Sequence, residues 1–480
     1  MFFSYTFRYI NIFKNSKFNL KEKKMEKRIK LFGGVSILAG IMIGSGIFFL
    51  GGQILSRIGN SLLLSLLAWL VGGLITLFSA LTYAELGSLF PENGGYFVYL
   101  SKAYGKRTAF LSGHMNLVLS SSGSIALLAL FFGQFIAFIV PGLGSGGATW
   151  LGVWAIVILT IVNWMGLKAG VVTQVIFMVA KIIPIVMVIL MAYVAGDVIP
   201  ETTSVLSEMT FFEILIGFGF AVVGTLWAYE GWTNLNAIAG NMKEPKKDLP
   251  KALSISTIGV MIVYVLFIFS MYRLVPYQTI VETNEAGGFF IFNAAYVLFG
   301  EAGLGVIMIS VAISVFGALN GSIMVFPRVY QKMSKNGLFF KVFSKENEFK
   351  VPGYSLLISS GIGLTLLLLG FDIDALLTFV VFAGLIFNTL IFYSVFKFRK
   401  THPIKEHPRY QVWGYPTVPI VAIVSMGMLL IATLVESFVP SLIGVAVLAV
   451  GYLIVRLKIK EPKKRTLKSG STESTPQKKS

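Results

Sequence analysis

The chain has 480 residues, of which 55% carry apolar side chains and only 13% are charged. Its mean hydropathy is +0.79, whereas soluble domains carry roughly 25% charged residues and cannot bury so much apolar surface. Long apolar segments recur until about Arg456 and leave no room for an extramembrane domain. Composition therefore excludes a soluble enzyme or binding module and predicts an all-α polytopic membrane protein.

The net charge of +18 comes from 40 Lys and Arg residues against 22 Asp and Glu residues. In a soluble protein this excess suggests nucleic-acid binding, but here alternate loops and both tails carry the basic residues, as the positive-inside rule requires. The loops at 198–210 and 276–300 contain Glu but no Lys or Arg. We therefore expect a lipid bilayer as surroundings, no nucleic-acid partner and both termini in the cytoplasm. The basic clusters are 14–30, 102–107, 243–251, 328–350, 397–409 and 456–468.

The chain contains no cysteine. This excludes a disulfide framework, a thiolate metal site and a disulfide-linked partner subunit. No cluster of metal ligands and no nucleophile motif is present, and two of the three histidines, His402 and His407, fall in an expected cytoplasmic loop. We therefore expect no metal ion and no cofactor.

A spanning helix needs about 20 apolar residues, and by this measure the sequence predicts twelve spans between basic tails at 1–30 and 458–480. An even number of spans agrees with two cytoplasmic tails. The expected spans are 31–55, 62–86, 110–140, 150–167, 171–196, 212–241, 251–275, 300–333, 353–371, 373–398, 416–436 and 438–457.

The first expected span contains the triplet Gly44-Ser45-Gly46 in its middle. Glycine is a poor helix former, and no water in lipid replaces the backbone hydrogen bonds that a break leaves open. Small residues at this spacing either let another helix pack closely or unwind the helix so that its N–H and C=O groups face a ligand. The triplet alone slightly favours close packing.

The third expected span contains His114, Asn116 and the run Ser120 to Gly123. A helix face of small polar residues is usually an interhelical contact. The same face also suits the wall of a cavity, and both interpretations stay open.

The fifth expected span contains Lys181 about ten residues from either end. A lysine near the bilayer centre costs roughly 2.5–3.5 kcal/mol even on the lenient insertion scale. Snorkelling to the interface suits lysines within a turn or two of the membrane surface, and Lys181 lies deeper. We expect its ammonium to point into the bundle, toward backbone carbonyls or a carboxylate.

The sixth expected span is interrupted at mid-depth by Glu230, Gly231 and two asparagines. Glu230 could merely neutralise a lysine elsewhere, but with Gly231 it indicates a second broken helix. Because this break comes five spans after the first, the pattern is that of two inverted five-helix repeats whose broken helices meet at the membrane midplane. The expected repeats are 31–196 and 212–398, followed by two extra helices at 416–457. This second break moves the interpretation of the Gly44 triplet from packing to ligand binding.

Several motifs in a fixed order resemble one transporter family. They are Gly44 to Phe48, Pro91 to Tyr99, Trp227 to Trp232 with Gly240 to Pro245 and Leu249-Pro250, Asn320 to Ser322, Asn336 to Leu338, and Val412 to Pro416. From about Leu31 to Val455 the chain resembles the amino acid–polyamine–organocation (APC) superfamily, within it the L-type amino acid transporter branch, and most closely the bacterial serine/threonine exchangers.

The resemblance implies a leucine-transporter-type fold in which main-chain groups hold the head of an amino acid. The N–H groups of Ser45 and Gly46 would receive the carboxylate, and the carbonyls of Met42, Trp227 and Glu230 would receive the ammonium. The complete expected substrate site is Met42, Ile43, Gly44, Ser45, Gly46, Trp227, Tyr229, Glu230, Gly231 and Asn320.

Three further positions take their expected roles from the resemblance. Trp227 matches the aromatic gate over the substrate. Lys181 matches a lysine that takes the place of sodium in sodium-independent relatives, so we expect sodium independence. Ser322 departs from relatives with an aromatic residue there, which leaves the size of the side-chain pocket open.

We therefore expect a plasma-membrane amino acid permease, in the bacterial inner membrane, that exchanges small neutral L-amino acids such as serine and threonine. It would work by alternating access, alone and without bond chemistry. The main alternative is an exchange or proton-coupled carrier of cationic amino acids or polyamines that uses the Glu230 carboxylate. More remote alternatives are a channel and an intramembrane enzyme in which Lys181 and Glu230 do acid–base work.

Overall fold

The structure is a computed structural model that describes residues 29–140, 142–195, 206–285 and 290–458. Within these ranges the chain is helical and contains no β-strand. Nearly all of the expected basic tails and much of the acidic loop at 198–210 lie outside the described residues. The elements are α2 (Leu31–Met42), α3 (Gly46–Arg57), α4 (Leu62–Leu89), α5 (Tyr96–Tyr104), α6 (Lys106–Met115), η1 (Asn116–Ser120), α7 (Ser121–Ile139), α8 (Gly144–Trp164), α9 (Leu167–Ala195), η2 (Leu206–Glu208), α10 (Phe211–Ala228), η3 (Asn234–Asn241), α11 (Pro245–Leu274), α12 (Tyr277–Glu285), α13 (Phe290–Lys335), η4 (Lys341–Ser344), α14 (Gly353–Leu368), α15 (Ile373–Thr401), α16 (Thr417–Glu436) and α17 (Phe438–Lys458).

Ten of the described helices are long and apolar enough to cross a membrane, and the pair α2 and α3 adds an eleventh span with a bend of 45°. The remaining expected span corresponds to α14, whose 16 residues fall short of the roughly 20 that a full crossing needs. The all-α polytopic fold class is thus confirmed. The number of twelve spans and the boundaries of the repeats stay predictions.

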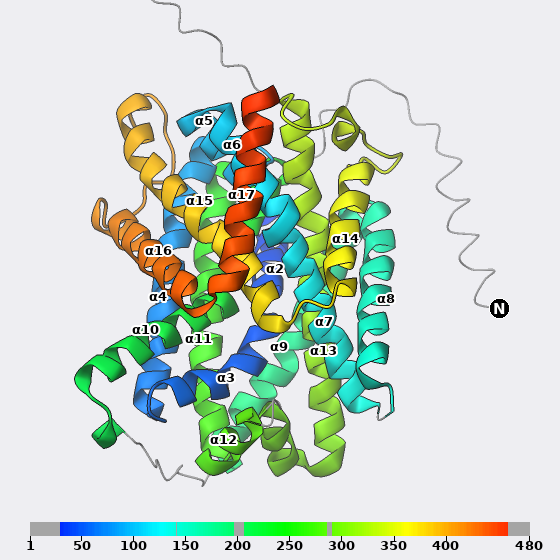
Figure 1. Cartoon of the computed structure of the whole chain (residues 1–480), viewed down its shortest axis with the longest axis vertical. Helices are drawn as coiled ribbons and strands as arrows, with labels where there is room; N and C mark the ends of the chain where they lie inside the picture. Colours follow the sequence, from blue (N-terminus) through cyan, green and yellow to red (C-terminus); the bar gives the residue numbers. More distant parts are fainter. Residues whose placement is uncertain (1–28, 141, 196–205, 286–289, 459–480) are drawn as a thin grey trace, which may run out of the picture.

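α2 stands at the centre of the bundle (Figure 1), where α9, α11 and α13 pack around it. α4 packs along α10 and α11, while α7 packs against α8, α13 and α14. α16 and α17 contact α4, α6 and α15. The end of the bundle at the top of Figure 1 carries α5, α6 and the C-terminal ends of α15 and α17. We call it the basic end, because Lys102, Lys106, Lys397 and Lys400 lie on these elements.

The first expected span is broken at the predicted place. α2 ends at Met42, and α3 begins at Gly46 with its axis turned by 45°. The last C=O groups of α2 and the first N–H groups of α3 therefore lack partners within their own helices. Partners from other helices, or a ligand, must satisfy them, because lipid does not.

The sixth expected span is broken as well. α10 ends at Ala228, and Gly231 in the following turns has φ +111°, a value that glycine adopts far more readily than other residues. The chain then continues as the tighter 3₁₀ helix η3 and not as the α-helix that the span at 212–241 implied. η3 is buried, and the side chain of its Asn236 donates through Nδ2 to the Tyr99 hydroxyl on α5 at 2.8 Å.

The two breaks touch each other. A Cβ atom on Gly46 would lie 2.7 Å from Cα of Ala228, and one on Gly231 would lie 2.7 Å from Cγ2 of Ile41. Glycine is therefore needed at Gly46 for close packing as well as for breaking the helix. By contrast, a Cβ atom on Gly44 would make an ordinary contact of 3.5 Å. The close-packing interpretation of the triplet is therefore correct at Gly46, and ligand binding by the triplet stays a prediction.

Lys181 on α9 holds the first break in place. Its side chain is 1% exposed, so snorkelling does not occur. Its ammonium donates hydrogen bonds to the carbonyl oxygens of Gly40 at 2.9 Å, Ile43 at 2.5 Å and Ser314 on α13 at 2.9 Å. Three donors meet three acceptors, and a cation at the C-terminal end of α2 also stabilises the helix dipole.

Replacement of Lys181 by methionine tests this role. Lys181→Met keeps the length of the side chain but leaves the carbonyls of Gly40 and Ile43 short of a donor. A buried polar group without its partner costs about 1–3 kcal/mol, so we expect a lower melting temperature of the purified protein in detergent. Lys168→Met, at an exposed position on the same helix, is the control. Equal melting temperatures of the two variants would contradict the assignment.

Candidate functional site

A cavity of about 90 Å³ lies between the two breaks, with room for several water molecules or a small solute. Both broken helices contribute to its wall, together with α4, α5, α6, η1, α7, α13 and α15. Seven of the ten residues expected at the substrate site line it: Met42, Gly44, Ser45, Gly46, Trp227, Glu230 and Gly231.

Ile43 and Tyr229 do not line the cavity but support its wall. The Ile43 carbonyl accepts hydrogen bonds from Lys181 and from the Ser314 hydroxyl at 3.0 Å. Tyr229 is fully buried, and its hydroxyl donates to the carbonyl of Trp69 on α4 at 3.0 Å. These two residues, like Lys181, therefore make hydrogen bonds that fix the broken segments on the side that faces away from the cavity.

Asn320 on α13 also lies behind the cavity, in a chain of buried amides. Its Oδ1 accepts from Asn163 Nδ2 and its Nδ2 donates to Gln174 Oε1, both at 2.9 Å. Asn163 lies on α8 and Gln174 on α9, so the chain joins three helices that surround α2. The side chain of Asn320 is thus occupied by structural contacts, whereas Ser322, two residues further along α13, lines the cavity.

Some main-chain groups of the breaks already have donors within the protein. The Met42 carbonyl accepts from the Gly44 N–H at 2.8 Å and from the Tyr264 hydroxyl at 2.7 Å. The Trp227 carbonyl accepts from the Glu230 N–H at 2.9 Å. A carbonyl has two acceptor sites, so a ligand ammonium at Met42 has to displace a donor.

The N-terminal end of α3 offers free donors at the cavity. Ser45 caps α3 and Gly46 is its first residue, where the N–H groups have no partner within the helix and the dipole is positive. Among the described residues, the buried hydroxyl of Ser45 also has no hydrogen-bond partner. This end of the cavity is suited to an anionic group.

Trp227 stands between the central cavity and a wider hollow of about 560 Å³ that opens among α3, α10, α15, α16 and α17. Its ring lies 6.0 Å from the ring of Phe131 on α7, which in turn lies 6.2 Å from that of Phe135. Aromatic rings therefore close the cavity on the side away from the basic end. This position fits the gate role that the family resemblance assigns to Trp227.

Four polar residues spaced four apart, Ser112, Asn116, Ser120 and Ser124, line the cavity along α6, η1 and α7. In a regular α-helix with 3.6 residues per turn such a stripe drifts around the axis. Here η1 is a wider π-helical turn, and it turns the stripe back toward the cavity. Both sequence interpretations of this face hold: Asn116 and Ser120 line the cavity, and the Ser120 hydroxyl also makes an interhelical contact by donating to the Val380 carbonyl on α15 at 2.8 Å.

Among the cavity residues absent from the expected site are Tyr83 on α4 and Asn388 on α15. The Tyr83 hydroxyl donates to Asn388 Oδ1 at 2.7 Å, and both side chains line the cavity. The available signal was an asparagine in the middle of the apolar tenth span. Nothing in the sequence marked Tyr83 as a cavity residue, because tyrosine is common in helices of any kind.

The cavity wall contains a single ionisable acidic or basic side chain. Glu230 supplies the one carboxylate among its lining residues, and no Lys or Arg lines it. Within the described ranges, no group of three His, Cys, Asp or Glu residues is placed to hold a metal ion. The arrangement offers donors at the start of α3 and acceptors near the end of α10, which together complement a small zwitterion.

Comparisons with known proteins agree with this geometry. The sequence model of the family described as "Amino acid permease" matches residues 29–456. The serine/threonine exchanger SteT of Bacillus subtilis is 33% identical over 90% of this chain and 98% of its own length. The mouse b(0,+)-type amino acid transporter 1 is 27% identical over 81% of this chain and 79% of its own. The human large neutral amino acids transporter small subunit 2 is 29% identical over 89% of this chain and 79% of its own length.

The family model covers nearly the whole of the described bundle, including both breaks and the helices that line the cavity. The match therefore extends over the site as well as over the fold. The three relatives are named an exchanger and two transporters. The chain belongs to the amino acid permease family of the APC superfamily.

Proposed function

We propose that the protein exchanges small neutral L-amino acids, serine and threonine first, by alternating access and without bond chemistry. The observation that carries this proposal is the small polar cavity enclosed by the two broken helices. The match to the Bacillus serine/threonine exchanger over 98% of that protein supports the choice of substrate.

The substrate carboxylate binds at the start of α3, at the N–H groups of Ser45 and Gly46 and the Ser45 hydroxyl. The ammonium binds opposite, at the carbonyl and carboxylate of Glu230, where the end of α10 adds its negative dipole. A zwitterion thus satisfies both helix ends at once. The substrate hydroxyl then faces the polar stripe at Asn116 and Ser120, which favours serine and threonine over apolar amino acids of similar size.

Transport is independent of sodium. Lys181 already places one positive charge against the carbonyls of α2 and α13, the kind of oxygen ligands that a sodium ion needs. A sodium ion close to this ammonium would meet strong repulsion in a medium of low dielectric constant.

The protein lies in the plasma membrane with its basic end in the cytoplasm, in accordance with the positive-inside rule. It acts as a single chain, and the absence of cysteine excludes a disulfide-linked subunit. One human relative is named a small subunit, so purification of the active protein without a second polypeptide is the direct check.

A second candidate function rests on Glu230. Its carboxylate lines the cavity without a cationic side chain beside it, and it could bind the second ammonium of a cationic amino acid or polyamine. The two functions differ in what the Glu230 side chain does, since the main-chain contacts are the same in both.

Counterflow into proteoliposomes tests the main proposal. Vesicles loaded with unlabelled serine should take up labelled serine and threonine, while empty vesicles should not, because exchange needs a substrate on both sides. An inward sodium gradient should leave the initial rate unchanged. Equal uptake into empty vesicles, or a rate that rises steeply with the sodium gradient, would contradict the exchange or the sodium prediction respectively.

Substitution of Gly46 tests the main-chain site. A methyl group at Gly46 meets the backbone of Ala228 at 2.7 Å, so Gly46→Ala should displace the start of α3 and weaken serine binding at least tenfold, about 1.4 kcal/mol. The control is Gly224→Ala on α10, where the nearest atom is 3.7 Å away. Thermal stabilisation by serine measures both variants, and an unchanged shift in Gly46→Ala would contradict the assignment.

Glu230→Gln separates the two candidate functions. If Glu230 binds a second ammonium, the variant should lose arginine and lysine transport while serine transport remains. If the substrate is neutral, serine uptake should fall a few-fold, through loss of one charge near the ammonium, and arginine should not be transported by either form. Glu213→Gln, at the start of the same helix and away from the cavity, is the control.

A further inference from the structure

A fully buried aromatic layer separates the cavity from the basic end. Tyr83 on α4 packs edge-on against Trp232 at 5.0 Å and against Phe392 on α15 at 5.9 Å between ring centroids. Tyr99 on α5 completes the layer, 5.6 Å from Tyr83. Each of these side chains is at most 2% exposed. These buried rings therefore pack between α4 and α15 beside the cavity, whose wall Tyr83 also lines.

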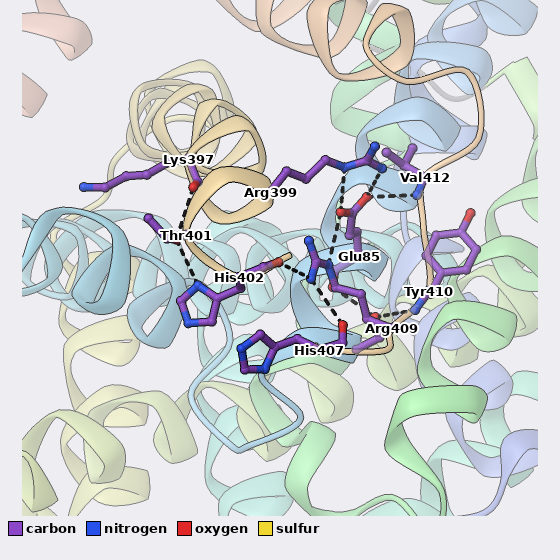
Figure 2. Close-up of polar contacts among 10 residues, drawn as sticks. Glu85, Lys397, Arg399, Thr401, His402, His407, Arg409, Tyr410 and Val412 are labelled. Carbon is purple, nitrogen blue, oxygen red and sulfur yellow. Dashed lines mark hydrogen bonds and ion pairs between the residues drawn. The ribbon is translucent and has the colours of Figure 1, made fainter. Parts of the chain in front are cut away.

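Beyond this layer, toward the basic end, the carboxylate of Glu85 on α4 receives four hydrogen bonds (Figure 2). Its Oε1 accepts from Arg399 Nε at 2.9 Å and from Arg409 Nε at 3.3 Å, and its Oε2 accepts from Arg399 Nη2 at 2.7 Å and from the Val412 N–H at 2.9 Å. Four donors use the four acceptor sites of a carboxylate. Glu85 is 1% exposed, and the Arg409 side chain is fully buried.

The partners of Glu85 come from α15 and from the connection between α15 and α16. Arg399 lies in the last turn of α15, and its guanidinium stacks on the Tyr415 ring at 3.7 Å. Arg409 donates to the carbonyls of His402 and His407, which folds the connection around it. The Glu85 carboxylate thus ties α4 to two segments that follow it by more than 300 residues.

We propose that Glu85 is the positioning residue that holds the cytoplasmic gate of this transporter closed. In the closed form its carboxylate clamps α4 to α15 and to the α15–α16 connection. In the form open to the cytoplasm this clamp is broken, and the aromatic layer around Tyr83 parts with it. The inference rests on the proposed transport by alternating access, with the basic end in the cytoplasm.

The geometry favours a gate because the aromatic layer and the clamp join the same two helices. Tyr83 and Glu85 are two residues apart on α4, and their partners Asn388 and Arg399 both lie on α15. A path from the cavity to the basic end between these helices requires both contacts to separate. The two parallel hydrogen bonds of a bidentate arginine–carboxylate pair form only in a narrow range of geometries. When α4 and α15 move apart, water therefore replaces both hydrogen bonds, and few partly bonded arrangements lie between the closed and the open form.

The absence of cysteine allows a direct test of this gate. A single reporter, Ser124→Cys, places one thiol in the cavity with no background. A membrane-impermeant methanethiosulfonate reagent is then applied to the full-length protein in right-side-out cells and in inside-out membrane vesicles. The two labelling rates measure access to the cavity from each side of the membrane.

Adding Glu85→Gln to the reporter should raise the labelling rate in inside-out vesicles about tenfold and lower it in right-side-out cells, as expected for a shift between two states. Glu346→Gln, which removes a carboxylate at the same end that pairs with Lys335 on α13, should change neither rate. Unchanged rates in Glu85→Gln would overturn the proposal. Equal increases from both sides would also overturn it, since they indicate a loosened fold and not a gate.

If Glu85→Gln fails to fold, Arg399→Lys keeps a cation but loses the paired hydrogen bonds. It should raise the labelling rate from the cytoplasmic side by a few-fold, and no change there would overturn the gate. The labelling needs no substrate, so its result does not depend on which amino acid is transported. If serine counterflow fails but the labelling rates change as predicted, the proposed substrate is wrong and the proposed role of Glu85 in the gate is supported.

Discussion

The architecture of the site depends on one buried ammonium. Breaking a helix inside a membrane leaves carbonyl groups that neither lipid nor the helix itself can satisfy. Lys181 supplies three donors to carbonyls of α2 and α13, and Tyr264 supplies a hydroxyl to Met42. These contacts from α9 and α11 let the break persist as a fixed feature, and the remaining backbone groups are free to face the cavity.

The close approach of the two breaks follows from their glycines. Gly46 sits against the backbone of Ala228, and Gly231 sits against Ile41. The helix ends therefore meet at one small cavity, whose positive end is the start of α3 and whose negative end is near Glu230. The proposed recognition of a zwitterion by main-chain groups depends on this contact, because no Lys or Arg side chain lines the cavity.

The cavity is closed by different chemistry on its two sides. Toward the outer hollow the barrier consists of the rings of Trp227 and Phe131. Toward the basic end the layer around Tyr83 is backed by the Glu85 ion pairs. Packed rings separate without leaving a charge in need of a new partner, whereas a buried ion pair separates only when water or another partner replaces it. We therefore propose that the two barriers differ in how sharply they open.

The sequence by itself determined the membrane class, both helix breaks and the inward-pointing lysine. The composition excludes a soluble protein. Gly44 to Gly46, Lys181 and Glu230 are unfavourable in a helix surrounded by lipid, so their presence in apolar spans predicts helix breaks and side chains that face the protein interior. The tertiary structure alone decided which side chains reach the cavity. Asn320 was expected there and lies in an amide chain behind it, and Tyr83 was not expected and lines it. The hydrogen bonds of Glu85 could not be predicted from the sequence either. Their donors lie more than 300 residues further along the chain and are brought to α4 only by the packing of α15.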